Sequence, residues 1–331
     1  MKVAINGFGR IGRRTLKFLL QNSNIELVAI NDLANTKVLA HLLKYDSIHG
    51  PFKGSIEHDD SSISINGLKI KVYSEPDPNM LPWQGIDIVL ESTGRFTEKE
   101  KALSHIKAGA KKVIISAPAT GDLKTIVLGV NDDILSSNDV IISNASCTTN
   151  CLAPMVKLLD AHFGIEHGFL TTVHAYTADQ NLQDAPHTDL RRARAAAMNI
   201  IPTSTGAAKA VQLVLPHLKG KLSGASMRVP VSNGSITDFT CVVKQAVSRE
   251  EINLVFETAA NGPLKGILEY TSDPIVSLDI VGNTHSCVFD SQLTQVIGGT
   301  MVKVVGWYDN ESGYSARLAD LIMRVGSLIH P

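Results

Sequence analysis

The sequence lacks several features that mark specialised classes of protein. Its 331 residues include only four cysteines, and 31 basic against 32 acidic residues leave a formal net charge of −1. So few cysteines do not indicate a disulfide scaffold, and no general electrostatic field attracts nucleic acid or an acidic membrane. No apolar run reaches the roughly 18 residues that a membrane-spanning helix needs. An anionic ligand must therefore be held locally.

The amino terminus also lacks the basic and apolar segments of a secretory signal, because it leads directly into strand-like residues 3–6. We therefore expect a cytoplasmic protein whose thiols stay reduced, so that at least one is free for chemistry. Hydrophobic residues make up 44% of the chain and charged residues 19%, which is typical of a soluble globular protein. The length predicts two domains of roughly 150 residues each.

The first part of the chain alternates short β-branched runs with helical stretches. A helix after the first strand is expected to pack through Ile11, Thr15, Phe18 and Leu19. This alternation predicts a doubly wound α/β domain with a parallel sheet covered on both faces. The expected strands are residues 3–6, 26–31, 86–91, 112–116, 125–130 and 140–143.

After about Asn150 the pattern changes to longer strands. The hairpin-like pair Asn233-Gly234 indicates a mixed or antiparallel sheet in a second, α+β domain. A capping box at residues 248–251 predicts a helix that ends at Gly262. The long polar segment 177–200 is expected to be functional or interfacial. The other expected elements are a helix at 152–162 and strands at 168–176, 225–231, 235–243, 275–279 and 301–308.

A glycine-rich turn follows the first strand and precedes the first helix. In Gly7-Phe8-Gly9-Arg10-Ile11-Gly12, the three glycines permit a tight turn, close approach of a pyrophosphate, and close packing of helix and strand. Asp32 ends the second strand, where a carboxylate accepts hydrogen bonds from ribose hydroxyls and repels the additional phosphate of NADP. The context favours NAD binding over a coincidental turn, in which Asp32 would only cap a strand or helix.

Cys147 is the candidate nucleophile among the cysteines. It lies where strand 140–143 gives way to a helix, whose dipole and N–H groups favour a thiolate. Cys151 shares its helix face, but this spacing suits neither a zinc site nor a disulfide, and Cys241 and Cys287 are interpreted as buried apolar residues. His174 ends a strand before the polar segment, and on sequence alone it is either catalytic or structural.

Four segments together give the chain a specific resemblance. Residues 5–13, 143–151, 189–209 and 307–311 resemble the glyceraldehyde-3-phosphate dehydrogenase family, and the resemblance extends over the whole chain. It implies a Rossmann-type NAD-binding domain at 1–147, completed by a C-terminal helix at 311–331, and a catalytic and tetramerisation domain at 148–310. It also implies oxidation of glyceraldehyde 3-phosphate to 1,3-bisphosphoglycerate with NAD and inorganic phosphate, in a cytoplasmic homotetramer without a metal.

The resemblance implies a role for each matching residue. Cys147 matches the nucleophile and His174 the general base. Cofactor contacts are implied for Asn6, Gly7, Gly9, Arg10, Ile11, Gly12, Asp32, Thr93, Ser116, Asn310 and Tyr314. Binding of the substrate phosphate and inorganic phosphate is implied for Ser146, Thr148, Thr177, Arg191, Thr205, Gly206 and Arg228.

Some positions have a simpler interpretation or depart from the family pattern. On composition alone, Arg192 belongs to a solvated loop, and residues 205–209 only begin a helix. Ser312 stands where the family usually has Trp, and Pro76 where many members have Arg beside the adenine. The alternative functions are erythrose-4-phosphate dehydrogenase activity and, in another class, secondary binding of RNA or a cell surface. The near-zero net charge does not support the latter.

Overall fold

The computed structural model describes residues 1–329, which form two compact units. The first unit contains residues 1–126, 133–145 and the chain from Ser315 onward; the second contains 127–132 and 146–314. Residues 330 and 331 of the predicted C-terminal helix lie outside the described residues. Each unit has its own sheet, as expected for a two-domain protein.

The first unit is built on a nine-stranded sheet that is parallel from β5 to β8 and antiparallel only between β3, β4 and β5. Val3, Ala4 and Ile5 of the central strand β1 are fully buried, as a strand covered on both faces requires. The predicted doubly wound sheet is confirmed. In spatial order the strands are β3 (Ile56–His58), β4 (Ser62–Ile65), β5 (Leu68–Tyr73), β2 (Glu26–Asn31), β1 (Lys2–Asn6), β6 (Ile88–Glu91), β7 (Lys112–Ile115), β9 (Ile141–Ser143) and β8 (Lys124–Thr125).

The helices of this unit include α1, whose buried face differs slightly from the predicted one. Thr15 and Leu19 are buried as expected, but Gly12 and Leu16 complete the face, while Ile11 and Phe18 are only half-buried. Because Gly12 has no side chain, the first turn of α1 lies close against the sheet. The buried face of the helix is therefore rotated toward Gly12. The helices are α1 (Arg10–Leu19), α2 (Thr36–Lys44), α3 (Lys99–Lys107) and most of α7 (Ser312–Ile329), with short 3₁₀ turns at Pro78–Met80 and Asp132–Ile134.

The second unit is built on a mixed sheet of eight strands. Strand β10 runs parallel to β12 and antiparallel to β13, and β14 is parallel to β15. The predicted mixed or antiparallel sheet is confirmed. The order is β11 (Ile201–Thr203), β12 (Leu222–Val229), β10 (Ile165–Ala175), β13 (Ser235–Val243), β17 (Met301–Tyr308), β15 (Cys287–Asp290) and β14 (Leu268–Thr271), and β16 (Gln295–Ile297) pairs with β17.

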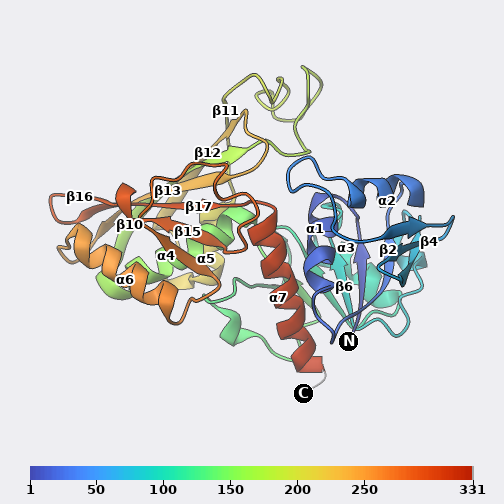
Figure 1. The fold of residues 1–331 in the computed structure, drawn as a ribbon. Helices are drawn as coiled ribbons and strands as arrows, with labels where there is room; N and C mark the ends of the chain where they lie inside the picture. Colours follow the sequence, from blue (N-terminus) through green and yellow to red (C-terminus); the bar gives the residue numbers. More distant parts are fainter. Residues whose placement is uncertain (330–331) are drawn as a thin grey trace. The chain divides into compact units, whose positions relative to one another are not determined.

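Three helices pack against this sheet: α4 (Cys147–Phe163), α5 (Ala207–Val214) and α6 (Arg249–Asn261) (Figure 1). The capping box is confirmed, because the Ser248 hydroxyl accepts the Glu251 N–H and the Glu251 carboxylate accepts the Ser248 N–H. Helix α6 ends before Gly262, as predicted. This unit also contains short 3₁₀ turns at Pro216–Leu218, before α6, and at Ser291–Leu293, after it.

Three sequence-based expectations about strands are wrong. Strand β8 ends at Thr125, and the Asn131 side chain accepts the Val127 N–H in a turn that replaces the rest of the predicted strand. Residues 275–279 form a turn in which the Asp279 carboxylate accepts the N–H of Val276. Asn233-Gly234 is no hairpin turn, because β12 and β13 lie on opposite sides of β10. In the first two cases a local hydrogen bond overrides an apolar run, and in the third the sheet order overrides a turn signal.

The long segment 177–200 contains neither helix nor strand. Large apolar side chains project from it into solvent, among them Leu182, Leu190 and Met198, each about four-fifths exposed. Within residues 1–329, none of the helices combines the length and the hydrophobicity of a membrane-spanning segment.

Candidate active site

Cys147 is the first residue of α4, in the second unit. The side chain of Ser146, the residue that caps this helix, accepts the backbone N–H of Thr149 at 3.1 Å. The half-buried Cys147 places its Sγ atom 3.4 Å from Nε2 of His174. Two residues far apart in sequence, singled out as nucleophile and base, therefore lie within hydrogen-bonding reach.

His174 is held near the end of β10 by its surroundings. Its ring is buried, with Nδ1 2.7 Å from the carbonyl oxygen of Ala175. The register of the parallel pair β10 and β12 places Arg228 directly beside His174. As a result, Nη1 of Arg228 lies 2.7 Å from His174 Nδ1 and 3.0 Å from the Ala175 oxygen. The sheet thus positions base and guanidinium together.

The charge states of this pair follow from burial and from Arg228. Desolvation raises the pKa of the Cys147 thiol, although the Arg228 charge and the N–H groups at the start of α4 act in the opposite direction. The N–H groups at the start of α4 favour the thiolate, as expected, but desolvation of the thiol outweighs them. Desolvation, followed by the Arg228 charge, lowers the pKa of His174 to about 3. The resting pair is a thiol beside a neutral imidazole.

Tyr308 is a buried neighbour that sequence reasoning missed. Its hydroxyl lies 2.9 Å from Oγ1 of Thr148 and 2.9 Å from Oγ1 of Thr172. Its ring meets the His174 ring nearly edge-on, with centroids 5.9 Å apart. Desolvation raises the pKa of Tyr308, so its hydroxyl stays protonated. The Thr148 hydroxyl, expected near a phosphate, is thereby bonded to Tyr308, because α4 packs on β17.

The segment after β10 folds around Arg192 rather than leaving it solvated. Arg192 pairs with Asp179 at 2.7 Å and donates to the hydroxyl of Thr203 at 2.9 Å, so its interpretation as a free loop charge is wrong. Thr177, expected to bind phosphate, donates its hydroxyl to Asp179. The neighbouring Arg191 is exposed. Asp179 is therefore an organising residue that sequence reasoning overlooked.

The remaining predicted residues of the second unit lie at helix starts. The Thr205 hydroxyl accepts the N–H of Ala207, and Gly206 caps α5, so this stretch does begin a helix. The buried Asn310 accepts a hydrogen bond from the hydroxyl of Ser235 at 2.9 Å.

Ser312 and Tyr314 lie in the first turn of α7, where both are buried. The N–H of Ser312 donates to the Asp309 carboxylate at 2.7 Å. Ser312, at the position where Trp was expected, is therefore a small buried residue in the first turn of α7.

A separate pocket of about 280 Å³ opens in the first unit at the carboxyl ends of the central parallel strands. This edge of a doubly wound sheet is where such folds bind ligands. Five residues expected to contact the cofactor line it, namely Asn6, Gly7, Gly9, Asp32 and Thr93. Of the other expected contacts, Arg10, Ile11 and Gly12 form the first turn of α1, and Ser116 follows β7.

The glycine turn has the geometry that a pyrophosphate requires. Gly7 has a positive φ of 93°, and a Cβ there would lie 2.6 Å from the Thr93 nitrogen. A Cβ on Gly12 would lie 2.2 Å from the Gly7 oxygen. At Gly9 a Cβ would meet no atom within 4 Å, and no side chain caps α1 there, so a ligand can approach the backbone. These residues fit a dinucleotide.

The pocket wall next to the glycine turn contains two charged residues, Asp32 and Arg95. It also contains Pro76, which stands where many members of the resembled family have Arg. Asp32 accepts the N–H of Phe8 at 2.7 Å and that of Ala34 at 3.0 Å, which fixes its carboxylate in the pocket wall. Pro76 lines the same pocket, as does Arg95, a cation that sequence reasoning did not identify. Within residues 1–329, no group of three or more His, Cys, Asp or Glu is arranged to hold a metal ion.

Comparison with known proteins agrees with this geometry. Residues 1–99 match the NAD binding domain of glyceraldehyde 3-phosphate dehydrogenase, and residues 146–310 match the C-terminal domain of the same family. The chain belongs to the glyceraldehyde-3-phosphate dehydrogenase family. This confirms the resemblance drawn from its sequence segments.

Curated members of the family match over nearly their full length. Glyceraldehyde-3-phosphate dehydrogenase 2 of Streptomyces avermitilis is 58% identical over 99% of both chains. Glyceraldehyde-3-phosphate dehydrogenase 1 of Bacillus subtilis is 56% identical over 97% of both. The enzyme of Borreliella burgdorferi is 57% identical over 98% of this chain and 99% of its own.

Proposed function

We propose that this protein catalyses the NAD-dependent, phosphorylating oxidation of glyceraldehyde 3-phosphate to 1,3-bisphosphoglycerate. The observation that carries the proposal is the 3.4 Å separation between Cys147 Sγ and His174 Nε2, in a chain that belongs to this family. The pair supplies a nucleophile and a base for attack on an aldehyde. In this proposal Cys147 is the nucleophile and His174 the general base.

The catalytic cycle begins when the substrate phosphate engages Arg228. The His174 Nδ1–H then donates to the Ala175 carbonyl, and Nε2 is left to accept the thiol proton. The Cys147 thiolate attacks the aldehyde carbon, and His174 Nε2 returns this proton to the carbonyl oxygen, which gives a thiohemiacetal. As the hydride leaves the same carbon, the hydroxyl proton passes back to His174 Nε2. NAD, when bound, supplies the acceptor for the hydride that leaves this carbon.

A thioester on Cys147 remains after oxidation. Inorganic phosphate attacks its carbonyl carbon, breaks the bond to sulfur and leaves as an acyl phosphate, while Cys147 is restored as thiolate. The phosphate site is proposed to include Ser146, Thr148, Arg191, Thr205 and Gly206. In support, the start of α5 at Gly206 offers backbone donors, and Arg191 is exposed.

The cofactor is proposed to bind the pocket of the first unit. Gly7, Gly9 and the first turn of α1 would hold the pyrophosphate, and Asp32 the ribose hydroxyls. The fit of the glycine turn and the match of residues 1–99 to an NAD binding domain support this assignment. Asn310 and Tyr314 are further proposed cofactor contacts.

The protein is further proposed to act in the cytoplasm as a homotetramer. The exposed apolar side chains Leu182, Leu190 and Met198 of segment 177–200 support an interface with another copy of the chain. Such side chains, close together in one irregular segment, are unfavourable in solvent unless a neighbour covers them.

One assay tests the proposed reaction. NADH formation from glyceraldehyde 3-phosphate is followed with and without inorganic phosphate, and erythrose 4-phosphate is supplied in parallel. We expect sustained turnover only with the three-carbon substrate and phosphate. Oxidation of the four-carbon sugar without phosphate would instead identify an erythrose-4-phosphate dehydrogenase.

A further inference from the structure

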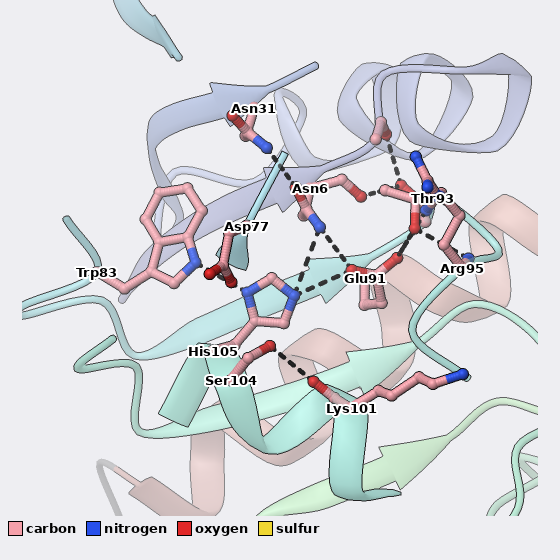
Figure 2. A network of polar contacts seen from close by, with 12 residues as sticks. Asn6, Asn31, Asp77, Trp83, Glu91, Thr93, Arg95, Lys101, Ser104 and His105 are labelled. Carbon is pink, nitrogen blue, oxygen red and sulfur yellow. Dashed lines mark hydrogen bonds and ion pairs between the residues drawn. The ribbon is translucent and has the colours of Figure 1, made fainter. Parts of the chain in front are cut away.

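A chain of buried polar side chains runs from Trp83 to the wall of the first unit's pocket (Figure 2). Trp83 and His105 are fully buried, and Glu91 is 1% exposed. None of these three residues takes part in the reaction proposed above. Their hydrogen bonds nevertheless end on residues that line the pocket.

Trp83 fixes the direction of the hydrogen bonds that the His105 ring makes. Its indole N–H can only donate, and it lies 2.9 Å from Nδ1 of His105, which must therefore be the acceptor. A neutral His105 carries its proton on Nε2 and donates it to Glu91 Oε2 at 3.0 Å. Trp83 thus selects one tautomer of His105.

Both oxygens of Glu91 are occupied by donors. Oε2 also accepts the side-chain N–H of Asn6 at 2.6 Å, and Oε1 accepts the backbone N–H of Thr93 at 2.8 Å and the Thr93 hydroxyl. Every group that bonds the Glu91 carboxylate is a donor. The orientation of this carboxylate is therefore fixed by directed hydrogen bonds to both of its oxygens.

The donor and acceptor roles of the next side chains around the pocket follow from those of Glu91. Because the amide nitrogen of Asn6 faces Glu91, its oxygen accepts from Asn31 Nδ2 at 2.7 Å. The Asn31 amide then bonds both backbone groups of Glu75, each at 2.9 Å. Phe96 adds an edge-on contact to the His105 ring. Asn6, Asn31, Glu75, Thr93 and Phe96 all line the pocket.

We infer that Glu91 and His105 are positioning residues for the dinucleotide, which act through Asn6 and Thr93. This inference rests on the proposed function of the pocket. Glu91 fixes the orientation of the Asn6 amide and the Thr93 hydroxyl before ligand binds, so binding does not have to order them. Loss of the carboxylate weakens cofactor binding even where the fold survives.

Glu91→Gln is the most direct variant. Donors face both carboxylate oxygens, so either orientation of the new amide sets an N–H₂ group against other donors. His105→Phe removes both hydrogen bonds of the ring, whereas His105→Gln keeps one acceptor and one donor. Ser104→Ala is the matched control, because Ser104 donates only to the Lys101 carbonyl of the same helix.

The measurements separate positioning from stability. NAD affinity is measured by titration calorimetry on the folded protein, together with the melting temperature, KM for NAD and kcat. We expect Glu91→Gln to bind NAD about tenfold more weakly, the equivalent of one lost charge-assisted hydrogen bond, with KM affected more than kcat. His105→Phe should bind more weakly than His105→Gln, and Ser104→Ala like the unmodified protein.

The possible results are distinguishable. Failure of the unmodified protein to bind NAD overturns the proposed function itself. Normal NAD affinity in Glu91→Gln with a lowered melting temperature overturns the positioning role and leaves a structural one. If Glu91→Gln does not fold, the His105 variants decide, because equal NAD affinity of the Phe and Gln forms contradicts the inference.

Discussion

Nη1 of Arg228 lies 2.7 Å from Nδ1 of His174, and the same nitrogen donates to the carbonyl oxygen of Ala175. An arginine can only donate, so His174 Nδ1 accepts, and the ring proton is on Nε2, facing Cys147. An anion that draws the guanidinium away leaves Nδ1 free to donate to Ala175. The substrate phosphate is thereby expected to switch His174 into the tautomer that acts as a base.

Replacement of Arg228 by Met should affect both substrate binding and thiol reactivity. We expect KM for glyceraldehyde 3-phosphate to rise roughly tenfold to a hundredfold, through loss of a charge-assisted hydrogen bond. Because the Arg228 charge lowers the pKa of Cys147, labelling by iodoacetamide should require higher pH in the variant. Arg249→Met is the control, since Arg249 bonds only backbone carbonyls of Ser291 and Gln292. An unchanged pH profile would contradict the electrostatic role.

Cys147→Ser separates chemistry from cofactor binding. Turnover should fall by at least roughly 10³-fold, as for loss of a nucleophile in other covalent enzymes. NAD binding, measured by calorimetry, should persist, because the pocket that fits the dinucleotide is built from the first unit alone. Cys241→Ala, at a buried position in β13, should keep both properties. Retained turnover in Cys147→Ser would refute the assignment of the nucleophile.

His174 makes stability depend on pH. Its pKa is about 3 in the folded protein and about 6.5 in an unfolded chain, so the unfolded state binds the additional proton between these values. The contribution of His174 is therefore fully present above pH 6.5 and is lost as pH falls toward 3. The difference between the two pKa values corresponds to a change of at most about 5 kcal/mol in the free energy of unfolding.

His174→Asn should accordingly lose less stability than the unmodified protein between pH 6.5 and 4, as followed by melting temperature. The same variant should slow turnover by about 10²- to 10⁴-fold, the usual contribution of a general base. Parallel melting curves for the two proteins over this pH range would show that His174 is not buried in its neutral form.

Asp32 should determine the preference between the two nicotinamide cofactors. The carboxylate in the pocket wall repels an additional ribose phosphate, so we expect kcat/KM to be much higher with NAD than with NADP. Asp32→Ser should lower kcat/KM for NAD and narrow this ratio. A preference of the unmodified protein for NADP would be incompatible with the role given to Asp32.

Short sequence patterns predicted the structural features that depend only on neighbouring residues in the chain. The glycine turn, the capping box at Ser248 and a helix start close to Cys147 each depend on a few consecutive residues, and the structure has all three, although α4 begins at Cys147 rather than at the expected residue 152. The role of His174 was ambiguous from sequence because its decisive contact is with a residue 27 positions away. Only the family resemblance selected it.

Features that depend on strand pairing could not be predicted. Tyr308 meets Thr172 because β17, β13 and β10 are neighbours in the sheet, and it meets Thr148 because α4 packs on β17. The Trp83–His105–Glu91 chain likewise joins three elements that carry no common motif. The predicted domain limits 1–147 and 148–310 and the ligand-contact roles of individual residues remain predictions.

The first unit takes residues from both ends of the chain. Met1 packs against Gly326 of α7, where a Cβ would lie 2.2 Å from the Met1 sulfur. During synthesis, α7 emerges only after the whole second unit has been translated. Synthesis proceeds at roughly 5–20 residues per second, so the nascent first unit must wait for its last helix until the second unit has been made. Truncation within α7 should consequently produce a protein that depends on chaperones and aggregates when they are limiting.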